Sequence, residues 1–172
     1  AYENPGWMNG HYVWYILPDG VEVKKVAFRE TGYDTEFAGS FACDDPFLNE
    51  LWKKAARTLY ITMRDTYFDC PDRERAQWWG DAELGEAFYA LSPSSHKLAA
   101  KGIRELVNWQ RDNGVLYSPV PGVGTSELPL QMLASIGWYG FYTQYFYSGD
   151  SSFVAEVYEP GHRYLHQVWQ GG

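Results

Sequence analysis

Residues 45–59 read Asp-Pro-Phe-Leu-Asn-Glu-Leu-Trp-Lys-Lys-Ala-Ala-Arg-Thr-Leu, and this stretch indicates a helical fold. Asp45 is a residue type that caps helix N-termini, and Pro46 suits the first helical position because its φ is already fixed there. Apolar residues then recur at three- and four-residue spacing, as on the buried side of an amphipathic helix: Leu48, Leu51, Trp52, Ala55, Ala56 and Leu59. The sequence therefore predicts a helix that starts at Asp45 and buries one side.

Four further helices are predicted downstream from the same periodicity and from their end signals. They cover about residues 78–91, residues 94 or 95 to 112, residues 127–147 and residues 150–169. The helix predicted over residues 127–147 is apolar on almost every side, so it is expected to be buried on several sides. Asp150 is expected to cap the last helix and Pro160 to kink it. Short connections between successive helices predict antiparallel helical hairpins, apart from residues 116–126, whose Pro and Gly content predicts a loop.

The first forty residues follow a different pattern. Residues 11–17 are rich in β-branched and aromatic side chains, Pro18-Asp19-Gly20 supplies turn chemistry, and apolar alternation resumes over residues 21–28. These features predict a β-hairpin, and residues 37–41 suit a further short strand. Because an isolated hairpin is only marginally stable in water, the strands are expected to belong to a larger sheet.

Composition excludes two classes of protein. Among 172 residues, 14 Lys and Arg stand against 22 Asp and Glu, a net charge of −8, so the chain lacks the basic patch of a nucleic-acid binder. No stretch approaches the roughly 20 apolar residues of a membrane-spanning helix, and the first residues do not resemble a signal peptide. Aromatic residues make up 18% of the chain, which suits either a thick core or a surface that stacks on sugars.

Two other groups of residues have a functional and a structural interpretation. Seven aromatic residues between positions 138 and 147 suit a stacking platform or a core, and their helical spacing favours the core. His162 and His166 are one helical turn apart but lack the third ligand of a zinc site. No motif in the sequence indicates a metal, a cofactor, a cellular compartment or an oligomeric state.

Polar reactive side chains are densest over residues 69–81, Asp-Cys-Pro-Asp-Arg-Glu-Arg-Ala-Gln-Trp-Trp-Gly-Asp. If the chain is helical from Glu74 onward, then Glu74, Trp78 and Asp81 share one face. Asp69 precedes Pro71 and is expected on a loop that folds back towards them. The spacing therefore allows three carboxylates to converge around one tryptophan.

This constellation suits acid-catalysed chemistry on a sugar. Glycoside hydrolysis needs a carboxylic acid that protonates the departing oxygen. Neighbouring carboxylates and an apolar tryptophan wall favour the protonated form of such a group, whereas the adjacent arginines oppose it. The structural alternative is a turn stabilised by ion pairs at a helix start, with Trp78 and Trp79 in the core. From spacing alone, the structural alternative is the more common outcome.

Residues 69–75 followed by Trp78-Trp79-Gly80-Asp81 resemble the signature of the bacterial α-L-rhamnosidase catalytic domain, an inverting glycoside hydrolase family with an (α/α)6 barrel. Residues 41–52 are similar to the entry into that family's first barrel helix, and residues 148–150 resemble a later turn. The resemblance covers about residues 29–169. It implies a mainly α fold, in which residues 41–172 form the N-terminal part of an incomplete (α/α)6 barrel of antiparallel helical hairpins. Residues 1–40 would be the terminal strands of a preceding β-sandwich domain.

The resemblance also implies roles for the residues of this block. Glu74 would be the general acid, Trp78 would line the sugar pocket, and Asp69, Arg73 and Asp81 would bind rhamnose hydroxyls. The implied substrate is a rhamnose-containing oligosaccharide or glycoside. Gln77 stands where the family commonly has Gly, which suggests a divergent subgroup.

An inverting enzyme needs a second carboxylate as general base. In the family this base is a Glu on a later barrel helix, which would lie beyond residue 172, so the chain alone is expected to be inactive. Two alternatives remain open from the sequence. One is a non-catalytic carbohydrate-binding module on the same fold, and the other is an (α/α)6 hydrolase of different sugar specificity.

Overall fold

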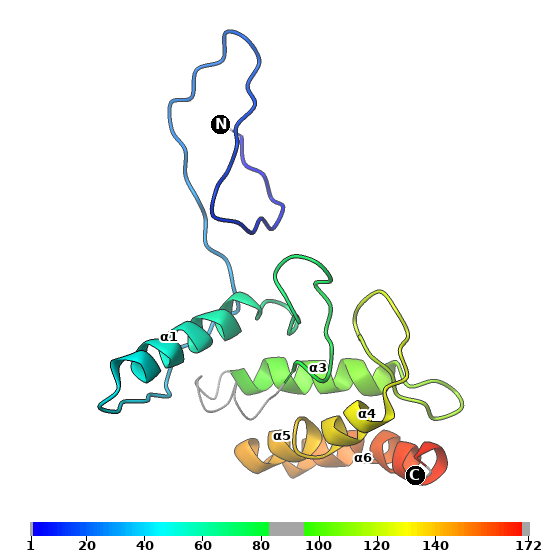
Figure 1. Cartoon of the computed structure of the whole chain (residues 1–172). Helices are drawn as coiled ribbons and strands as arrows, with labels where there is room; N and C mark the ends of the chain where they lie inside the picture. The colour runs from blue at the N-terminus through cyan, green and yellow to red at the C-terminus, as the bar shows by residue number, and fades with distance from the viewer. Residues whose placement is uncertain (1, 83–94, 170–172) are drawn as a thin grey trace. The chain divides into compact units, whose positions relative to one another are not determined.

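A computed structural model of the chain describes residues 2–82 and 95–169 (Figure 1). The chain divides into two units, Ala1–Thr31 and Gly32–Gly172. Every helix among the described residues lies in the second unit. In chain order these are α1 Pro46–Ile61, α3 His96–Asn108, α4 Pro129–Ile136, α5 Phe141–Ser148, α6 Ser151–Arg163 and the π-helix η2 Tyr164–Val168.

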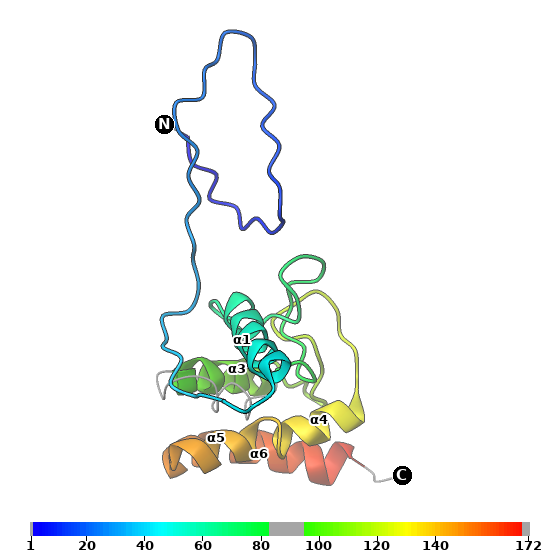
Figure 2. The ribbon, with the colours of Figure 1, turned by 60° about the vertical axis from the view of Figure 1, so that its left-hand side comes forward.

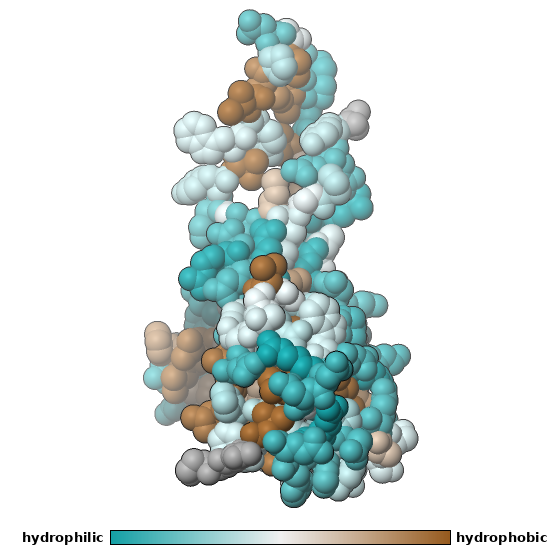
Figure 3. Space-filling model, turned by 90° about the vertical axis from the view of Figure 1, so that its right-hand side faces the viewer, coloured by the Kyte–Doolittle hydropathy of each residue, from teal (hydrophilic) through white to brown (hydrophobic). Residues whose placement is uncertain are grey.

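The first unit contains the predicted turn but not the predicted hairpin. The N–H of Val21 donates to the carbonyl of Pro18 at 3.3 Å, which closes the turn. No strand forms within residues 2–82 and 95–169, however, and Trp14 and Ile16 are at least 90% exposed. Figure 3 shows hydrophobic residues at the surface of this unit. A strand needs a partner for its backbone groups, and no described segment supplies one. The assignment of residues 1–40 to a β-sandwich domain stays a prediction.

Helix α1 begins where its sequence predicted. The Asp45 carboxylate accepts a 2.8 Å hydrogen bond from the N–H of Phe47, and Pro46 occupies the first turn. The prediction of a buried side is only partly met, because Ala56 is the buried residue of α1 and both Leu48 and Leu51 are more than 40% exposed. Periodicity identifies the apolar side of a helix but does not say what packs against it.

Helices α3, α5 and α6 lie side by side and enclose the core (Figures 1 and 2). The core side chains that are exposed by no more than 2% come from α3, α4, α6 and η2 and from the loops on either side of α3, and Phe141 of α5 packs against them. They include Met63, Trp79, Ile103, Leu106, Leu116, Met132, Phe153, Val157 and Tyr164. Helix α3 ends at Asn108 rather than near residue 112, and Gly114, with φ +85°, lies in the turn that follows.

The single helix predicted over residues 127–147 is two helices, α4 and α5, separated by Gly137–Gly140. A Cβ at Gly140 would overlap the carbonyl oxygen of Ser135, so this close approach of two backbone segments requires glycine. Glycine also disfavours helix interiors, and two glycines within four residues are enough to end one.

Most of the aromatic residues between positions 138 and 147 are exposed in this chain rather than buried. In α5 the buried residues are Thr143 and Gln144, whereas Trp138, Tyr142 and Phe146 are exposed and stacked on one another, with ring centroids 5.8 and 5.9 Å apart. Helical spacing alone did not distinguish a core stripe from a surface stripe.

The last predicted helix is confirmed with one refinement. The Asp150 carboxylate accepts hydrogen bonds from the N–H groups of Ser152 (3.0 Å) and Phe153 (3.2 Å), as an N-cap does. Pro160 lies inside α6, and the helix continues as the π-helix η2 from Tyr164. The helix predicted over residues 78–91 falls mostly outside the described residues, and its described part contains a turn at residues 79–81.

Candidate active site

The candidate site lies on a loop between α1 and α3, whose base is closed by Asp69 and Ala76. The N–H of Asp69 donates to the carbonyl of Ala76, and the N–H of Ala76 donates to Oδ1 of Asp69, both at 3.0 Å. Partial burial acts to raise the pKa of Asp69, but hydrogen bonds from Ala76 and Cys70 outweigh it, and the net effect is a lowered pKa. The carboxylate of Asp69 therefore stays ionised and holds the loop closed.

Glu74 lies within this loop and contacts Trp78. Nε1 of Trp78 donates a 2.6 Å hydrogen bond to Oε2 of Glu74, and Arg73 forms an ion pair with Oε1. Residues 74–78 have no regular secondary structure, and Arg75 has φ +50°, which a helix does not allow. The predicted juxtaposition of Glu74 and Trp78 is therefore present, but a loop produces it rather than a helical turn.

Asp81 completes the group of three carboxylates. Its N–H donates to the carbonyl of Trp78 at 3.1 Å in the turn that follows the loop. Partial desolvation, followed by the negative charges of Asp69 and Glu74, raises the pKa of Asp81. Asp69 and Glu74 thus act electrostatically on Asp81, although no helix from Glu74 onward brings the three carboxylates together.

The two arginines of the block have different surroundings. The side chain of Arg73 is 83% exposed and pairs with Glu74, so it faces solvent beside that carboxylate. Nε of Arg75 donates to the carbonyl of Pro71 at 3.0 Å and thereby supports the loop itself. Of the two, Arg73 is the arginine whose side chain is exposed next to Glu74.

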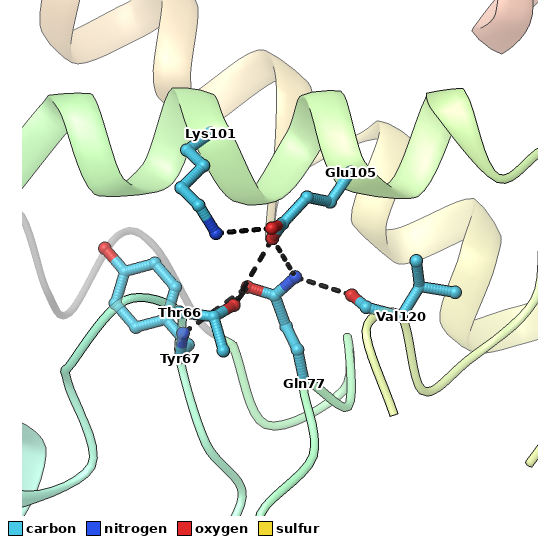
Figure 4. A network of polar contacts seen from close by, with 6 residues as sticks. All are labelled: Thr66, Tyr67, Gln77, Lys101, Glu105 and Val120. Atoms are coloured by element: carbon cyan, nitrogen blue, oxygen red, sulfur yellow. Dashed lines mark hydrogen bonds and ion pairs between the residues drawn. The ribbon is translucent and has the colours of Figure 1, made fainter. Parts of the chain in front are cut away.

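Gln77 is a buried residue of this block with no exposed surface (Figure 4). Its Nε2 donates to the carbonyl of Val120 at 2.6 Å and to Oε2 of Glu105 at 3.2 Å. Its Oε1 accepts from the hydroxyl of Thr66 and, at 3.4 Å, from the N–H of Tyr67. The sequence marked Gln77 only as a departure from the family pattern, and no local signal pointed to these partners.

The loop over residues 116–126 contacts the candidate site, as a loop that shapes a pocket would. The N–H of Gln77 donates to the carbonyl of Pro121 (3.0 Å), and the N–H of Val120 donates to the carbonyl of Gln77 (3.1 Å). The N–H of Trp79 donates to Oγ of Ser118 at 3.0 Å. Both loops lie on the same side of α3 in Figure 1, and these bonds join them directly.

The arrangement supplies an accessible carboxyl group, an indole and a guanidinium at one surface, which can bind a sugar and protonate an oxygen. Within residues 2–82 and 95–169, no three His, Cys, Asp or Glu side chains are grouped so as to hold a metal ion. The rings of His162 and His166 contact each other at a tilt of 33°, with centroids 4.2 Å apart. None of the helices in the described part of the chain has the length and apolar character needed to cross a membrane.

Comparison of the sequence with known proteins gives two matches. The family model for the bacterial alpha-L-rhamnosidase 6 hairpin glycosidase domain matches residues 36–171. An alpha-L-rhamnosidase of Formosa agariphila is 24% identical over 151 residues, in an alignment that covers 82% of this chain and 16% of that protein. The chain therefore spans a small part of the length of this relative.

Two solved structures are similar to the described fold. A GH78 family rhamnosidase of Bacillus sp. GL1 has a TM-score of 0.65 at 24% identity, over 78% of this chain and 14% of that one. An alpha-L-rhamnosidase from Dictyoglumus thermophilum has a TM-score of 0.66 at 25% identity, over 77% and 15%. Together with the family match, these structures confirm the prediction that the chain forms part of a six-hairpin helical domain.

Proposed function

Because the chain belongs to the bacterial alpha-L-rhamnosidase six-hairpin glycosidase family, we propose that its full-length protein hydrolyses terminal α-L-rhamnosyl groups with Glu74 as general acid. The observation that carries the proposal is the 2.6 Å hydrogen bond between Trp78 Nε1 and Glu74 Oε2. It holds a carboxyl group against an aromatic side chain that offers a sugar a stacking surface.

The surroundings of the three carboxylates support giving this role to Glu74. Asp69 accepts a backbone hydrogen bond that closes the loop, and such hydrogen bonds lower its pKa, so Asp69 is a poor proton donor. Asp81 lies past Trp78 in the turn, and Glu74 is the carboxylate that contacts both the indole and Arg73. Asp69, Arg73 and Asp81 would bind rhamnose hydroxyls around it, and Trp78 would line the pocket.

In the proposed reaction, Glu74 donates a proton to the glycosidic oxygen as the bond to the anomeric carbon breaks. A water molecule attacks the opposite face of the sugar, and a second carboxylate about 6.5–9.5 Å from the first accepts its proton, which inverts the anomeric centre. We place that general base on a later helix of the barrel, beyond residue 172. The substrate is a rhamnose-containing glycoside.

The test is the Glu74→Gln variant of the full-length protein, assayed on two aryl α-L-rhamnosides. Phenyl rhamnoside needs a proton on its leaving group, whereas dinitrophenyl rhamnoside releases a stable anion. Loss of a general acid should lower kcat on the phenyl substrate by about 10²–10⁴-fold and spare the dinitrophenyl substrate. Near wild-type turnover of both substrates would refute the assignment. If Asp81→Asn instead shows the leaving-group dependence, Asp81 is the acid.

A carbohydrate-binding module on the same fold would behave differently in this experiment. The full-length wild-type protein would then bind rhamnosides without turning them over, and Glu74→Gln would leave their affinity nearly unchanged. A hydrolase of different sugar specificity would show turnover in a panel of aryl glycosides, with rhamnoside among the poor substrates.

A further inference from the structure

Gln77 uses the full hydrogen-bonding capacity of its side chain, and its partners come from three separate parts of the chain. A glutamine amide offers two N–H donors and two acceptor lone pairs. Here the donors meet Val120 and Glu105, and the acceptors meet Thr66 and Tyr67. These contacts join the start of the site loop, helix α3 and the loop over residues 116–126 (Figure 4).

The backbone of Gln77 adds two hydrogen bonds to the loop over residues 116–126. Its N–H and carbonyl groups pair with Pro121 and Val120 at 3.0 and 3.1 Å. Gln77 is also the residue between Ala76, which closes the loop with Asp69, and Trp78, which binds Glu74. The closed base of the loop is therefore fastened to the core through Gln77, beside the further bond from Trp79 to Ser118.

Close packing prevents the side chain from moving elsewhere. Gln77 has no exposed surface, and a Cβ at Gly102 of α3 would lie 2.8 Å from its Oε1. A buried amide with four partners has one orientation, because any other leaves polar groups unsatisfied in the core. Glu105 is held in turn by an ion pair with Lys101, so the anchor on α3 is itself fixed.

We propose that Gln77 is the positioning residue of the site: its buried amide fixes the loop that holds Glu74 and Trp78 at the reacting bond. This inference rests on the proposed function and adds to it a residue that does not touch the substrate. General acid catalysis depends on geometry, and a displacement of about 1 Å can cost about 10²-fold in rate. A displaced Glu74 would impair proton donation while leaving sugar binding by exposed groups largely intact.

The test compares Gln77→Met with Gln144→Met in the full-length protein. Methionine keeps the length of glutamine and removes its hydrogen bonds. Gln144 is also a buried glutamine, but it lies on α5 and donates to the carbonyl of His96 at 3.4 Å, away from the site loop. We expect Gln77→Met to lower kcat on phenyl rhamnoside about 10–100-fold, with KM changed less than about threefold and dinitrophenyl rhamnoside spared. Gln144→Met should keep the wild-type ratio of the two substrates.

A rescue experiment separates positioning from general loss of structure. Gln77→Glu places a buried carboxylate opposite the partly buried Glu105, and we expect it to be worse than Gln77→Met because two like charges then lie side by side. Exchanging the two groups, as Gln77→Glu with Glu105→Gln, restores the hydrogen bond between the two side chains but leaves the carbonyl of Val120 without its donor. We therefore expect kcat on the phenyl substrate to lie between that of Gln77→Glu and that of the wild type. Equal loss of kcat on the phenyl and dinitrophenyl substrates in Gln77→Met would overturn the proposal.

A second readout does not depend on turnover. Sγ of Cys70 accepts from the N–H of Glu74 at 3.4 Å inside the loop, whereas Cys43 is exposed beside α1. We expect Gln77→Met to raise the alkylation rate of Cys70 several-fold and leave that of Cys43 unchanged, as measured peptide by peptide with mass spectrometry. Unchanged Cys70 reactivity would show that Gln77 does not hold the loop. A wild-type protein without rhamnosidase activity would refute the proposed function alone.

Discussion

Trp78 donates its indole N–H to Oε2 of Glu74 at 2.6 Å, although no helix joins the two residues. The bond couples the aromatic wall of the candidate pocket to the carboxyl group proposed as general acid. Because Arg73 occupies the other oxygen of Glu74, the carboxyl group is held from two sides. Rotation of Glu74 would therefore break at least one of these contacts.

Replacing Trp78 should separate sugar binding from proton donation. Trp78→Phe keeps an aromatic face but removes the N–H, so we expect kcat on phenyl rhamnoside to fall about tenfold, the equivalent of roughly 1.4 kcal/mol, with little change in KM. Trp78→Ala removes the face as well and should also raise KM. Steady-state kinetics of the full-length protein measure both parameters. A rise in KM with unchanged kcat in Trp78→Phe would mean that the hydrogen bond does not orient Glu74.

Asp69 and Asp81 should show opposite effects on stability. The pKa of Asp69 is lowered in the folded protein, so its charge stabilises the fold above about pH 4 and this contribution disappears as the pH falls through the folded pKa. The pKa of Asp81 is raised, so its ionisation costs stability as the pH rises through the folded value. At pH 7, Asp69→Asn should therefore lower Tm and Asp81→Asn should raise it.

Melting curves of the two variants between about pH 3 and pH 7 check this prediction. The shifts should be of order 1 °C in opposite directions at neutral pH, because both side chains are partly solvated. Both differences from wild type should shrink towards the acidic end of the range, where the unfolded carboxyl groups are protonated. Shifts of the same sign at pH 7 would contradict the pKa directions of these two groups.

Gly102→Ala is expected to change stability in the direction opposite to the usual effect of Gly→Ala in a helix. Gly→Ala inside a helix normally stabilises by about 0.5–1 kcal/mol. In α3, however, the new Cβ would lie 2.8 Å from Oε1 of Gln77 and 3.4 Å from Trp79. Because four hydrogen bonds hold the Gln77 side chain, we expect Gly102→Ala to destabilise the protein by about 1–3 kcal/mol, as overpacking does.

A double-mutant cycle with Gln77→Gly tests the cause of that loss. Removing the Gln77 side chain frees the space above Gly102, so Gly102→Ala should become neutral or stabilising in this background. Denaturant unfolding of the four proteins gives the coupling free energy. A loss of the same size in both backgrounds would place the clash elsewhere than at Gln77.

Local signals predicted the features that depend on a few neighbouring residues. Asp45 and Asp150 accept hydrogen bonds from N–H groups two or three positions away, so residue type and spacing were sufficient to place both helix starts. The same signals did not predict the break between α4 and α5. Gly137 and Gly140 were visible there, but glycine also occurs inside helices, and only the folded backbone shows that Gly140 lies too close to the carbonyl oxygen of Ser135 for a Cβ.

In the candidate site, too, local spacing predicted some features and long-range packing decided others. The spacing of Asp69, Glu74 and Asp81 indicated converging carboxylates, and the residues of the block indicated the family. The role of Gln77 depends on partners 11, 28 and 43 residues away, Thr66, Glu105 and Val120. Burial makes those bonds obligatory, because an unpaired amide in the core costs free energy that one in water does not. Residue types and short spacings are written in the chain, whereas long-range partners and burial arise only when distant segments pack together.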